Sequence, residues 1–376
     1  MQLPENNQSA PILNELNLSA ILREAVSLGA SDIHLRAGKP PLVRVAGKLF
    51  PLGLPSVTPE EAARCVDESL GSAQARAGYR ASGDHDFALE VADVGRFRVN
   101  AYRSRGTDSM VLRHIREEIP TLNQLGLPDS VRSLALAASG LVLICGPTGS
   151  GKSTTLAAMV GLINAERAMH ILTIEDPLEF LHTDKKSSVS QREVHIDTAD
   201  FASALRSGLR QDPDVIVIGE IRDTQTMGIA LQAAETGHLV LASVHAASVT
   251  DSVQRAMDLF PPEEQQHART VLAEVLQGVV SQRLVPSLVS ERRTLILEIA
   301  VATPRIRQAI RDSDKTSDLA GIIQDGEFYG MFSLQQDAVR RVLANEVSQE
   351  AAESVVTSLS DFRLSLKQSG YRSPHE

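Results

Sequence analysis

In the first part of the chain, apolar residues follow two different periods. Between residues 12 and 28 they recur every three or four positions and Gly29 follows, which predicts a helix closed by a glycine. The stretches "LVRVAG" and "RFRVNAY" alternate apolar and polar residues, as strands with one buried face do. In "RFRVNAY" one face carries Phe97, Val99 and Ala101, and the other carries Arg96, Arg98 and Asn100. With "DSMVLRHI" as a further strand, residues 1–115 are predicted to form a small α+β domain.

The pattern changes after the segment "REEIPTLNQLGLPDS", residues 116–130, whose two prolines and glycine predict a linker. Four short apolar runs then alternate with helical stretches; they are "LVLIC" (141–145), "HILTIE" (170–175), "VIVIG" (215–219) and "HLVLASV" (238–244). This order predicts a mostly parallel sheet with helices on both faces, over residues 131–376. Beyond about Ser248 the pattern predicts a mainly helical region, including "ARTVLAEVLQGVVSQRLV" and the tail after Gly330.

Charge and composition narrow the classes of protein to which this chain can belong. The 376 residues are enough for two domains, and 37 basic against 47 acidic side chains give a net charge of −10, which disfavours a general nucleic-acid binder. The N-terminus lacks the basic and apolar regions of a secretory signal, and no apolar run reaches the ~18–20 residues of a membrane helix. The chain has two cysteines, Cys65 and Cys145, and no paired C-x-x-C motifs, which disfavours a structural zinc site. Two cysteines fit a protein of the reducing cytosol. Cys145, in an apolar run, is expected to be buried.

The stretch "GPTGSGKST" matches the phosphate-binding pattern G-x-x-x-x-G-K-[ST]. It lies between a predicted strand and the predicted helix "KSTTLAAMVGLI", so a glycine-rich turn with a chance lysine is disfavoured. Glycines let backbone N–H groups surround the phosphates of a nucleotide, and the helix N-terminus adds partial positive charge. Lys152 is expected to reach the phosphates, and the Ser153 hydroxyl to bind Mg²⁺. The predicted binding residues are Gly146, Pro147, Thr148, Gly149, Ser150, Gly151, Lys152, Ser153 and Thr154.

Carboxylates follow two of the predicted strands. In "LTIEDPLEF", Glu175 and Glu179 lie where they can hold Mg²⁺ through water or orient an attacking water, although a solvated acidic turn is the alternative. In "DPDVIVIGEIRD" the usual Asp of such ATPase strands is replaced by Gly219, and Glu220 is the candidate general base.

Two histidines, His238 and His245, flank the last predicted strand in "TGHLVLASVH". Their odd separation along a strand places them on opposite faces. By themselves they fit a structural role better than a catalytic one, although a pair beside nucleotide-site strands can also sense the γ-phosphate.

Together these segments resemble the PilT-type secretion ATPases, the hexameric motors that retract type IV pili. "GPTGSGKSTTLAAM" is similar to the family's Walker A segment, "TIEDPLEF" to its Asp box, "DPDVIVIGEIRD" to its Walker B segment and "TGHLVLASVH" to its His box. Similarity extends to "GASDIHL", "RFRVNAY", "QREVHIDTADFASALRSGLRQDPD" and "LAEVLQGVVSQRLVP", and so covers most of the chain. A glycine at position 219 is typical of this family.

The resemblance implies a PAS-like N-terminal domain followed by a RecA-like P-loop ATPase core with a helical C-terminal part. It implies that Glu220 is the catalytic glutamate and that Glu175 and Glu179 support Mg²⁺ and water. It also makes His238 and His245 functional, which reverses the interpretation from the residues alone. Arginines of the N-terminal strands would act in trans on ATP as arginine fingers, and the candidates are Arg96, Arg98 and Arg113. A solvated sheet edge is the alternative for each of them.

The implied partners are a homo-hexamer, a platform protein of the inner membrane and a paralogous retraction ATPase, with the chain at the cytoplasmic face of that membrane. Assembly and type II secretion motors usually carry a further N-terminal domain and a four-cysteine insertion, and their lack here favours the retraction branch. The helix "AIRNLIR" of that branch is replaced by "RIRQAIRD", with Arg305 for an alanine, and the tail is more similar to the PilU paralogue. An accessory PilU-like role and a motor of a related system stay open. A RecA-like translocase on nucleic acid is disfavoured by the acidic charge and the lack of an aromatic-rich basic stretch.

Overall fold

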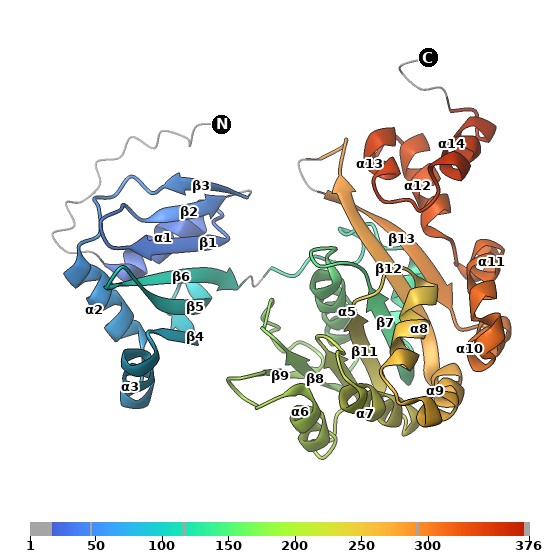
Figure 1. Cartoon of the computed structure of the whole chain (residues 1–376), viewed down its shortest axis with the longest axis horizontal. Coiled ribbons are helices and arrows are strands. Elements are labelled where there is room, and N and C mark those ends of the chain that lie inside the picture. The colour runs from blue at the N-terminus through green and yellow to red at the C-terminus, as the bar shows by residue number, and fades with distance from the viewer. Residues whose placement is uncertain (1–16, 46, 116–117, 291–292, 372–376) are drawn as a thin grey trace. The chain divides into compact units, whose positions relative to one another are not determined.

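The structure, a computed structural model, describes residues 17–45, 47–115, 118–290 and 293–371. The chain divides into two compact units, residues 1–117 and 118–376 (Figure 1). From Glu118 onward the segment predicted as a linker belongs to the second unit, where Leu122 and Leu127 are buried. The helix predicted over 12–28 is α1 (Leu18–Ser27), and residues 12–16 lie outside the described part.

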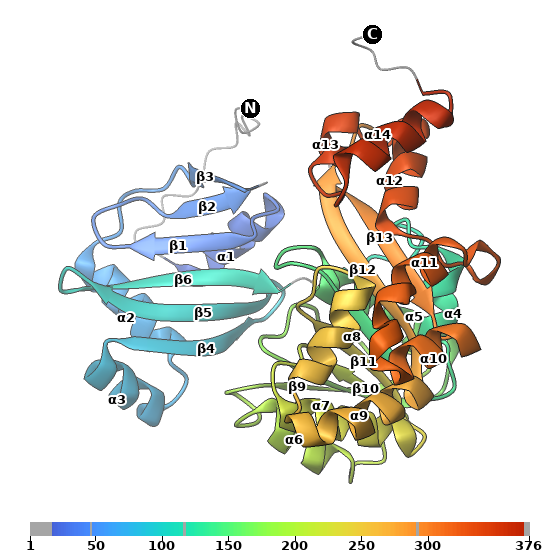
Figure 2. The ribbon, with the colours of Figure 1, turned by 45° about the vertical axis from the view of Figure 1, so that its right-hand side comes forward.

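The first unit is an antiparallel sheet with helices on one face. The strand order is β3-β2-β1-β6-β5-β4, seen most openly in Figure 2. The strands are β1 (Asp32–Arg36), β2 (Leu42–Val45), β3 (Lys48–Pro51), β4 (Asp84–Val91), β5 (Gly95–Ser104) and β6 (Thr107–Ile115). The helices are α1, α2 (Pro59–Ser69) and α3 (Ala73–Ser82). Each contributes residues to the single apolar core of this unit, which contains Leu22, Val66 and Tyr79.

The predicted alternation along β5 is confirmed. Phe97, Val99 and Ala101 are fully buried in the helix-covered face. The register places Arg98 opposite Arg113 of β6, on the face that these helices do not cover. One face of this sheet is therefore apolar and the other carries arginines.

The second unit is a mostly parallel, seven-stranded sheet with order β13-β12-β7-β11-β10-β8-β9. Its strands are β7 (Gly140–Cys145), β8 (His170–Glu175), β9 (Ser188–Glu193), β10 (Val215–Ile218), β11 (Leu239–Val244), β12 (Leu276–Pro286) and β13 (Arg293–Val301), and β13 alone is antiparallel to its neighbour. The helices between them are α4 (Asp129–Ala135), α5 (Lys152–Glu166), α6 (Phe201–Gly208), α7 (Thr224–Glu235), α8 (Val249–Asp258) and α9 (Pro262–Val275).

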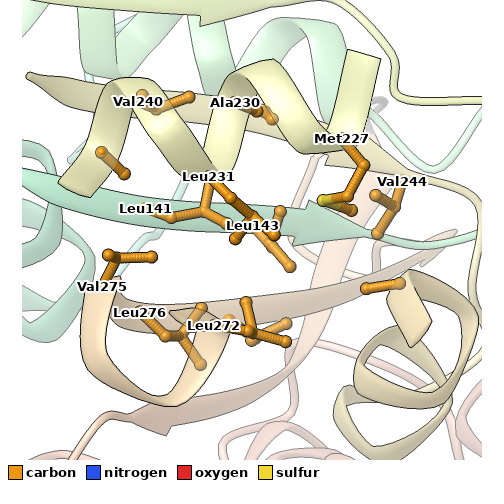
Figure 3. Close-up of a cluster of buried hydrophobic side chains, with 14 of the residues drawn as sticks. Leu141, Leu143, Met227, Ala230, Leu231, Val240, Val244, Leu272, Val275 and Leu276 are labelled. Carbon is orange, nitrogen blue, oxygen red and sulfur yellow. The ribbon is translucent and has the colours of Figure 1, made fainter. Parts of the chain in front are cut away.

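Two apolar cores lie on opposite faces of this sheet. Leu141 and Leu143 of β7 pack toward α7 and α9, as Figure 3 shows with Leu231 and Leu272 beside them. Val142 and Ile144 pack into the other core, with α4 and α5. Each central strand is buried on both sides, which explains its continuous apolar sequence. Cys145, at the end of β7, is buried as predicted, and burial raises the pKa of its thiol to about 11.

The prediction of a mainly helical region beyond Ser248 is wrong for residues 276–286 and 293–301, which form β12 and β13. Helix α9 ends at Val275, and the rest of "ARTVLAEVLQGVVSQRLV" forms β12, which pairs with β7 and β13. The four-residue spacing of Val271, Val275 and Val279 fits a helix. The exposed backbone edge of β7, however, can hydrogen-bond to this segment, and that pairing favours a strand.

The remaining chain is helical, as predicted. It contains α10 (Pro304–Arg311), η1 (Ser313–Asp318), α11 (Leu319–Gln324), η2 (Glu327–Tyr329), α12 (Leu334–Leu343), α13 (Gln349–Glu353) and α14 (Leu359–Gln368). Helices α12 and α14 share an apolar core with β12 and β13, which includes Phe362, Val342 and Ile296.

Candidate nucleotide site

The phosphate-binding loop joins the end of β7 at Cys145 to the start of α5 at Lys152. Gly146 and Gly151 have φ of 151° and 90°, backbone conformations that side chains rarely adopt. A Cβ at Gly146 would lie 2.5 Å from the carbonyl oxygen of Gln282, so only glycine fits this approach. The strand, turn and helix predicted around the motif are present, and the N-terminus of α5 opens onto the loop.

Lys152 folds back over its own loop. Its Nζ donates to the carbonyl oxygens of Gly146 at 3.0 Å and Pro147 at 3.1 Å. Burial lowers the pKa of the ammonium, while the charge of Glu220 raises it, with a net lowering. Beside this ammonium, Pro147, Thr148, Gly149 and Ser153 are exposed, and Thr154 is half-buried. The loop therefore offers a cation and accessible backbone to an anionic group.

A glutamine that the sequence did not single out supports this loop. Gln282 of β12 is fully buried. Its Nε2 donates to the Ser150 carbonyl oxygen at 2.7 Å, and its Oε1 accepts from Thr155 Oγ1 at 3.0 Å. The available signal was a polar residue inside the apolar run "VVSQRLV", once that run is known to be a strand. Gln282 ties the loop and the first turn of α5 to the sheet.

Glu220 follows the end of β10, two strands from β7 in the sheet. Its Oε2 accepts from Arg222 at 2.7 Å, and its Oε1 lies 2.9 Å from His245 Nε2. Burial opposes ionisation of Glu220, but the Arg222 hydrogen bond and the charges of His245, Arg222 and Lys152 outweigh it and lower its pKa. The carboxylate is therefore ionised at neutral pH and faces the cationic loop.

Packing explains why position 219 is a glycine and not the usual aspartate. A Cβ at this position would lie 3.2 Å from Glu175 Cα and 3.3 Å from the Ile174 carbonyl oxygen, both at the end of β8. The larger aspartate of the usual pattern would have to displace that backbone. The departure from the usual pattern thus leaves room for the acidic segment beside it.

Glu175 ends β8 and accepts hydrogen bonds from Thr173 Oγ1 at 2.8 Å and Gln191 Nε2 at 3.4 Å. Burial raises the pKa of its carboxyl to about 7, against the effect of these two bonds. Glu179 is exposed, and its charge also raises the pKa of Glu175. The two acids differ, one held in place by neighbours and the other at the surface.

The two histidines lie at opposite ends of β11. His245 follows the strand and reaches Glu220. His238 precedes it, beside the start of β7, and its Nδ1 lies 2.9 Å from the Ala233 carbonyl oxygen and 3.2 Å from Thr236 Oγ1. Within one chain, the structure brings His245 to Glu220 and leaves His238 at the opposite, amino-terminal end of β11.

The candidate arginines belong to the first unit. Arg98 and Arg113 face each other across β5 and β6, and Arg113 Nε donates to Asp32 Oδ1 at 2.8 Å. Asp32 is 7% exposed; burial raises its pKa, but hydrogen bonds from Arg113 and Ser31 and the nearby guanidinium charges lower it below 3.8. Arg96 lies on the same face, opposite Glu90 of β4 in the register. Arg113 is therefore already engaged in an ion pair within its own sheet.

Magnesium fits the donor set only together with a nucleotide. Within the described ranges, no group of three or more His, Cys, Asp or Glu side chains could hold a metal ion. The exposed Ser153 hydroxyl and the Glu175 and Glu179 carboxylates are oxygen donors of the type that Mg²⁺ prefers, and Mg²⁺ commonly takes its other ligands from phosphates and water. No helix in the described part of the chain has the length and apolar character needed to span a membrane.

Comparison with known proteins agrees with this geometry. The family model of type II/IV secretion system proteins matches residues 5–353. The type IV pilus retractation ATPase PilT of Pseudomonas aeruginosa is 41% identical over 337 residues, which cover 90% of this chain and 97% of that protein. The type IV pilus ATPase PilU of the same organism is 37% identical over 352 residues, covering 94% of this chain and 92% of that protein.

A solved structure supports the fold directly. The crystal structure of the pilus retraction motor PilT with bound ADP superposes with a TM-score of 0.85 at 41% identity, covering 92% of this chain and 99% of that one. The predicted fold class, an N-terminal α+β domain before a P-loop ATPase core, is confirmed by this match, apart from the strands β12 and β13 noted above. The chain belongs to the type II/IV secretion system protein family, and within it to the PilT/PilU-type pilus retraction ATPases.

Proposed function

We propose that this protein hydrolyses ATP with Mg²⁺ as a hexameric ring motor that powers type IV pilus retraction and twitching motility. One observation carries the enzymatic part. Lys152 of the phosphate loop and the Glu220–His245 pair lie at the carboxyl ends of neighbouring parallel strands, where α/β sheets bind ligands. The biological part rests on the likeness to PilT and PilU over most of the chain.

The roles follow from the geometry. The loop backbone and Lys152 would bind the β- and γ-phosphates, for which Lys152 exchanges its loop carbonyls for phosphate oxygens. When bound, Mg²⁺ would neutralise phosphate charge, held by Ser153 and through water by Glu175 and Glu179.

Glu220 would orient the attacking water and accept its proton, since its lowered pKa keeps it ionised. Each carboxylate oxygen has two lone pairs, so a water can bind Glu220 while Arg222 and His245 keep their contacts. We assign to His245 the positioning of Glu220.

Completion of the site requires neighbouring subunits in this proposal. Arg96, Arg98 and Arg113 would reach ATP of the adjacent subunit as arginine fingers, where guanidinium groups suit the charge of phosphoryl transfer. His238 lies away from the loop of its own chain, and in this proposal it would contribute to the site of a neighbouring subunit in the ring. Domain motions coupled to hydrolysis would act on a platform protein at the cytoplasmic face of the inner membrane.

An accessory, PilU-like role is the second candidate. The segment beyond residue 353, which the family model does not match, contains α14 packed on α12. Arg305, which replaces an alanine of the retraction helix, is exposed on α10. In this role the chain would bind a PilT-type motor and contribute chiefly by interaction.

Turnover by purified variants tests the enzymatic proposal. Lys152→Ala should abolish ATP hydrolysis, and Glu220→Gln should bind ATP but not turn it over, because the amide cannot accept the proton. Glu235→Gln, at the exposed end of α7, is the matched control and should keep normal activity. Sustained turnover by Glu220→Gln would contradict the assignment of the base.

Three further measurements test the rest of the proposal, and the first separates the primary from the accessory motor. ATPase activity of the pure protein, with and without a PilT-type partner, should be high alone if the chain is a primary motor. Sizing with and without nucleotide tests the hexamer. Deletion of the gene, scored by pilus retraction and twitching, tests the biological role.

A further inference from the structure

A pocket of about 340 Å³ lies in the first unit, whereas the phosphate loop belongs to the second. Three separate elements form it. Arg64 and Asp67 come from α2, Arg76 and Arg80 from α3, and Arg103 from the hairpin of β5 and β6. Nothing in the proposed motor cycle uses these residues.

The lining is cationic. Four arginines and two aspartates, Asp67 and Asp108, surround the pocket, and each aspartate is shared. Asp67 lies 3.6 Å from Arg76 and 3.4 Å from Arg80. Asp108 lies 3.5 Å from Arg103 and accepts a hydrogen bond from Tyr79. The acids Glu61 and Glu68 of α2 do not line the pocket, so guanidinium groups outnumber carboxylates there.

Several guanidinium donors remain available. Arg76 uses Nε for the Asp67 carbonyl oxygen at 3.1 Å, and Arg103 approaches Asp108 through Nε. In the part of the chain that the structure describes, the terminal nitrogens of Arg76 have no hydrogen-bond partner, whereas the guanidinium of Arg103 also hydrogen-bonds to Tyr79. Terminal guanidinium nitrogens bind phosphate oxygens in pairs, with both geometry and charge favourable.

The floor of the pocket is fixed by packing. Tyr79 is 3% exposed, and Val66 and Leu70 beside it are each 1% exposed. The guanidinium of Arg103 lies over the Tyr79 ring, 5.7 Å from its centre, and the Tyr79 hydroxyl donates to Asp108 at 2.7 Å. Arg103 is therefore held from two sides before any ligand arrives, which reduces the entropic cost of binding.

We propose that this pocket binds a small phosphate-bearing anion. Converging guanidinium groups offer more donors than the two oxygens of a carboxylate can accept, and the three terminal oxygens of a phosphate match them better. A volume of about 340 Å³ holds more than one phosphate, at the lower end of ligand pockets, so the ligand carries a second phosphate or a small organic group. Such a ligand would tie α2 and α3 to the β5–β6 hairpin and stabilise the first unit.

Calorimetric titration of the full chain with inorganic pyrophosphate tests the proposal. Because the proposed nucleotide site would also bind pyrophosphate, the titration uses the Lys152→Ala chain, in which that second site is weakened. Pyrophosphate should bind this chain with a stoichiometry of one and raise its Tm. Arg80→Glu in the same background should weaken binding by at least about tenfold, the loss expected for one charge-assisted hydrogen bond.

Arg80 is a safe position for charge reversal because its side chain is 70% exposed. Arg23→Glu, an exposed position of α1 outside the pocket, is the matched control and should bind as tightly as the parent. Arg103→Ala is a second variant that removes a donor from a different element, and its melting curve without ligand checks that the unit still folds.

Three results would overturn the proposal. The Lys152→Ala chain binds no pyrophosphate, or Arg80→Glu and Arg103→Ala bind it as tightly as the parent, or citrate binds as tightly as pyrophosphate. The last result would mean that the pocket attracts any polyanion. None of these results depends on ATP turnover, so the motor proposal and this one fail separately.

Discussion

The two sheets of this protein place their polar residues differently. In the seven-stranded sheet of the second unit, both faces are covered by helices, and strands such as β7 are buried along their whole length. Of the candidate site residues, Glu175 is the last residue of β8, and Glu220 and His245 follow the ends of β10 and β11. In the six-stranded sheet of the first unit, helices cover one face, and polar residues such as Arg98 and Arg113 lie along the strands on the other.

This difference follows from the connections. Parallel strands need crossovers, which cover both faces with helices and leave only the ends of the sheet for chemistry. Antiparallel strands are joined by short turns, so one face can stay open for contacts with water or a partner. A site at the ends of strands can be complete within one chain, whereas an open sheet face must contact water or a partner molecule.

The largest effect is expected for truncation of a strand that is buried on both faces. Leu143→Ala in β7 removes a fully buried side chain and should lower the free energy of unfolding by about 3–5 kcal/mol. Leu49→Ala in β3 is the matched control, since Leu49 is 46% exposed and pairs with Arg44 on the open face. It should change stability by less than about 0.5 kcal/mol. Denaturant unfolding measures both, and an equal loss at Leu49 would show that this face is covered in solution.

The second effect concerns the two ends of β11. His245→Ala removes the contact to Glu220 and should lower kcat on the order of a hundredfold, as loss of a group that positions a base does. His238→Ala should change kcat much less if the site of each chain acts alone. Steady-state ATPase assays of both variants measure the two values of kcat. Equal losses would show that His238 contributes to a site beyond its own chain, as the ring proposal requires.

The third effect compares two glutamines of β12. Gln282→Leu leaves the Ser150 carbonyl and the Thr155 hydroxyl without their partner, so the loop loses its support and the KM for ATP should rise about tenfold. Gln277→Leu removes a similar bond to Ser139, at the other end of the strand. It should leave KM unchanged. A KM unaffected by Gln282→Leu would mean that the loop holds its shape without β12.

The smallest effect belongs to the open face. Arg113→Ala removes the shorter ion pair of Asp32, leaves the one with Arg44, and should lower stability at pH 7 by about 1 kcal/mol, because Arg113 is largely exposed. The folded pKa of Asp32 is lowered, so its stabilising contribution is present above pH 3.8 and is lost as the pH falls through the folded pKa. The stability difference between the parent and Arg113→Ala should therefore disappear in acid. Thermal unfolding from pH 7 to pH 3 measures this, with Arg98→Ala as a control that keeps the Asp32 pair. A difference that persists in acid would show that Arg113 stabilises the sheet through packing.

The sequence predicted the elements whose pattern has a single reading. Strands β7, β8, β10 and β11 are continuous apolar runs between turns, and β5 alternates cleanly, so all were found. Strand β9 was missed because its sequence "SVSQRE" is polar, as an edge strand can be. Strand β12 was missed because its valines and leucines fit both helical and strand periods, and only pairing with β7 distinguishes them.

The residues of the candidate site also fall into those that the sequence predicts and those that it does not. The phosphate loop, Glu220 and the acidic segment could be proposed from the sequence because their chemistry depends on neighbours in sequence. Gln282 was not found, since its bonds to Ser150 and Thr155 span more than a hundred residues. The sequence also gave His238 and His245 equal weight, and the structure separates them by the length of β11.

The amino-acid pattern alone predicts the local chemistry of this protein, namely a loop with the phosphate-binding motif, acids at the ends of buried strands and a sheet with one arginine face. These depend on side-chain type and short-range spacing, which a linear pattern records. Which of these groups meet depends on the tertiary structure. The Glu220–His245 contact, the Gln282 support and the arginine pocket of the first unit each join segments whose neighbourhood arises from strand pairing and helix packing.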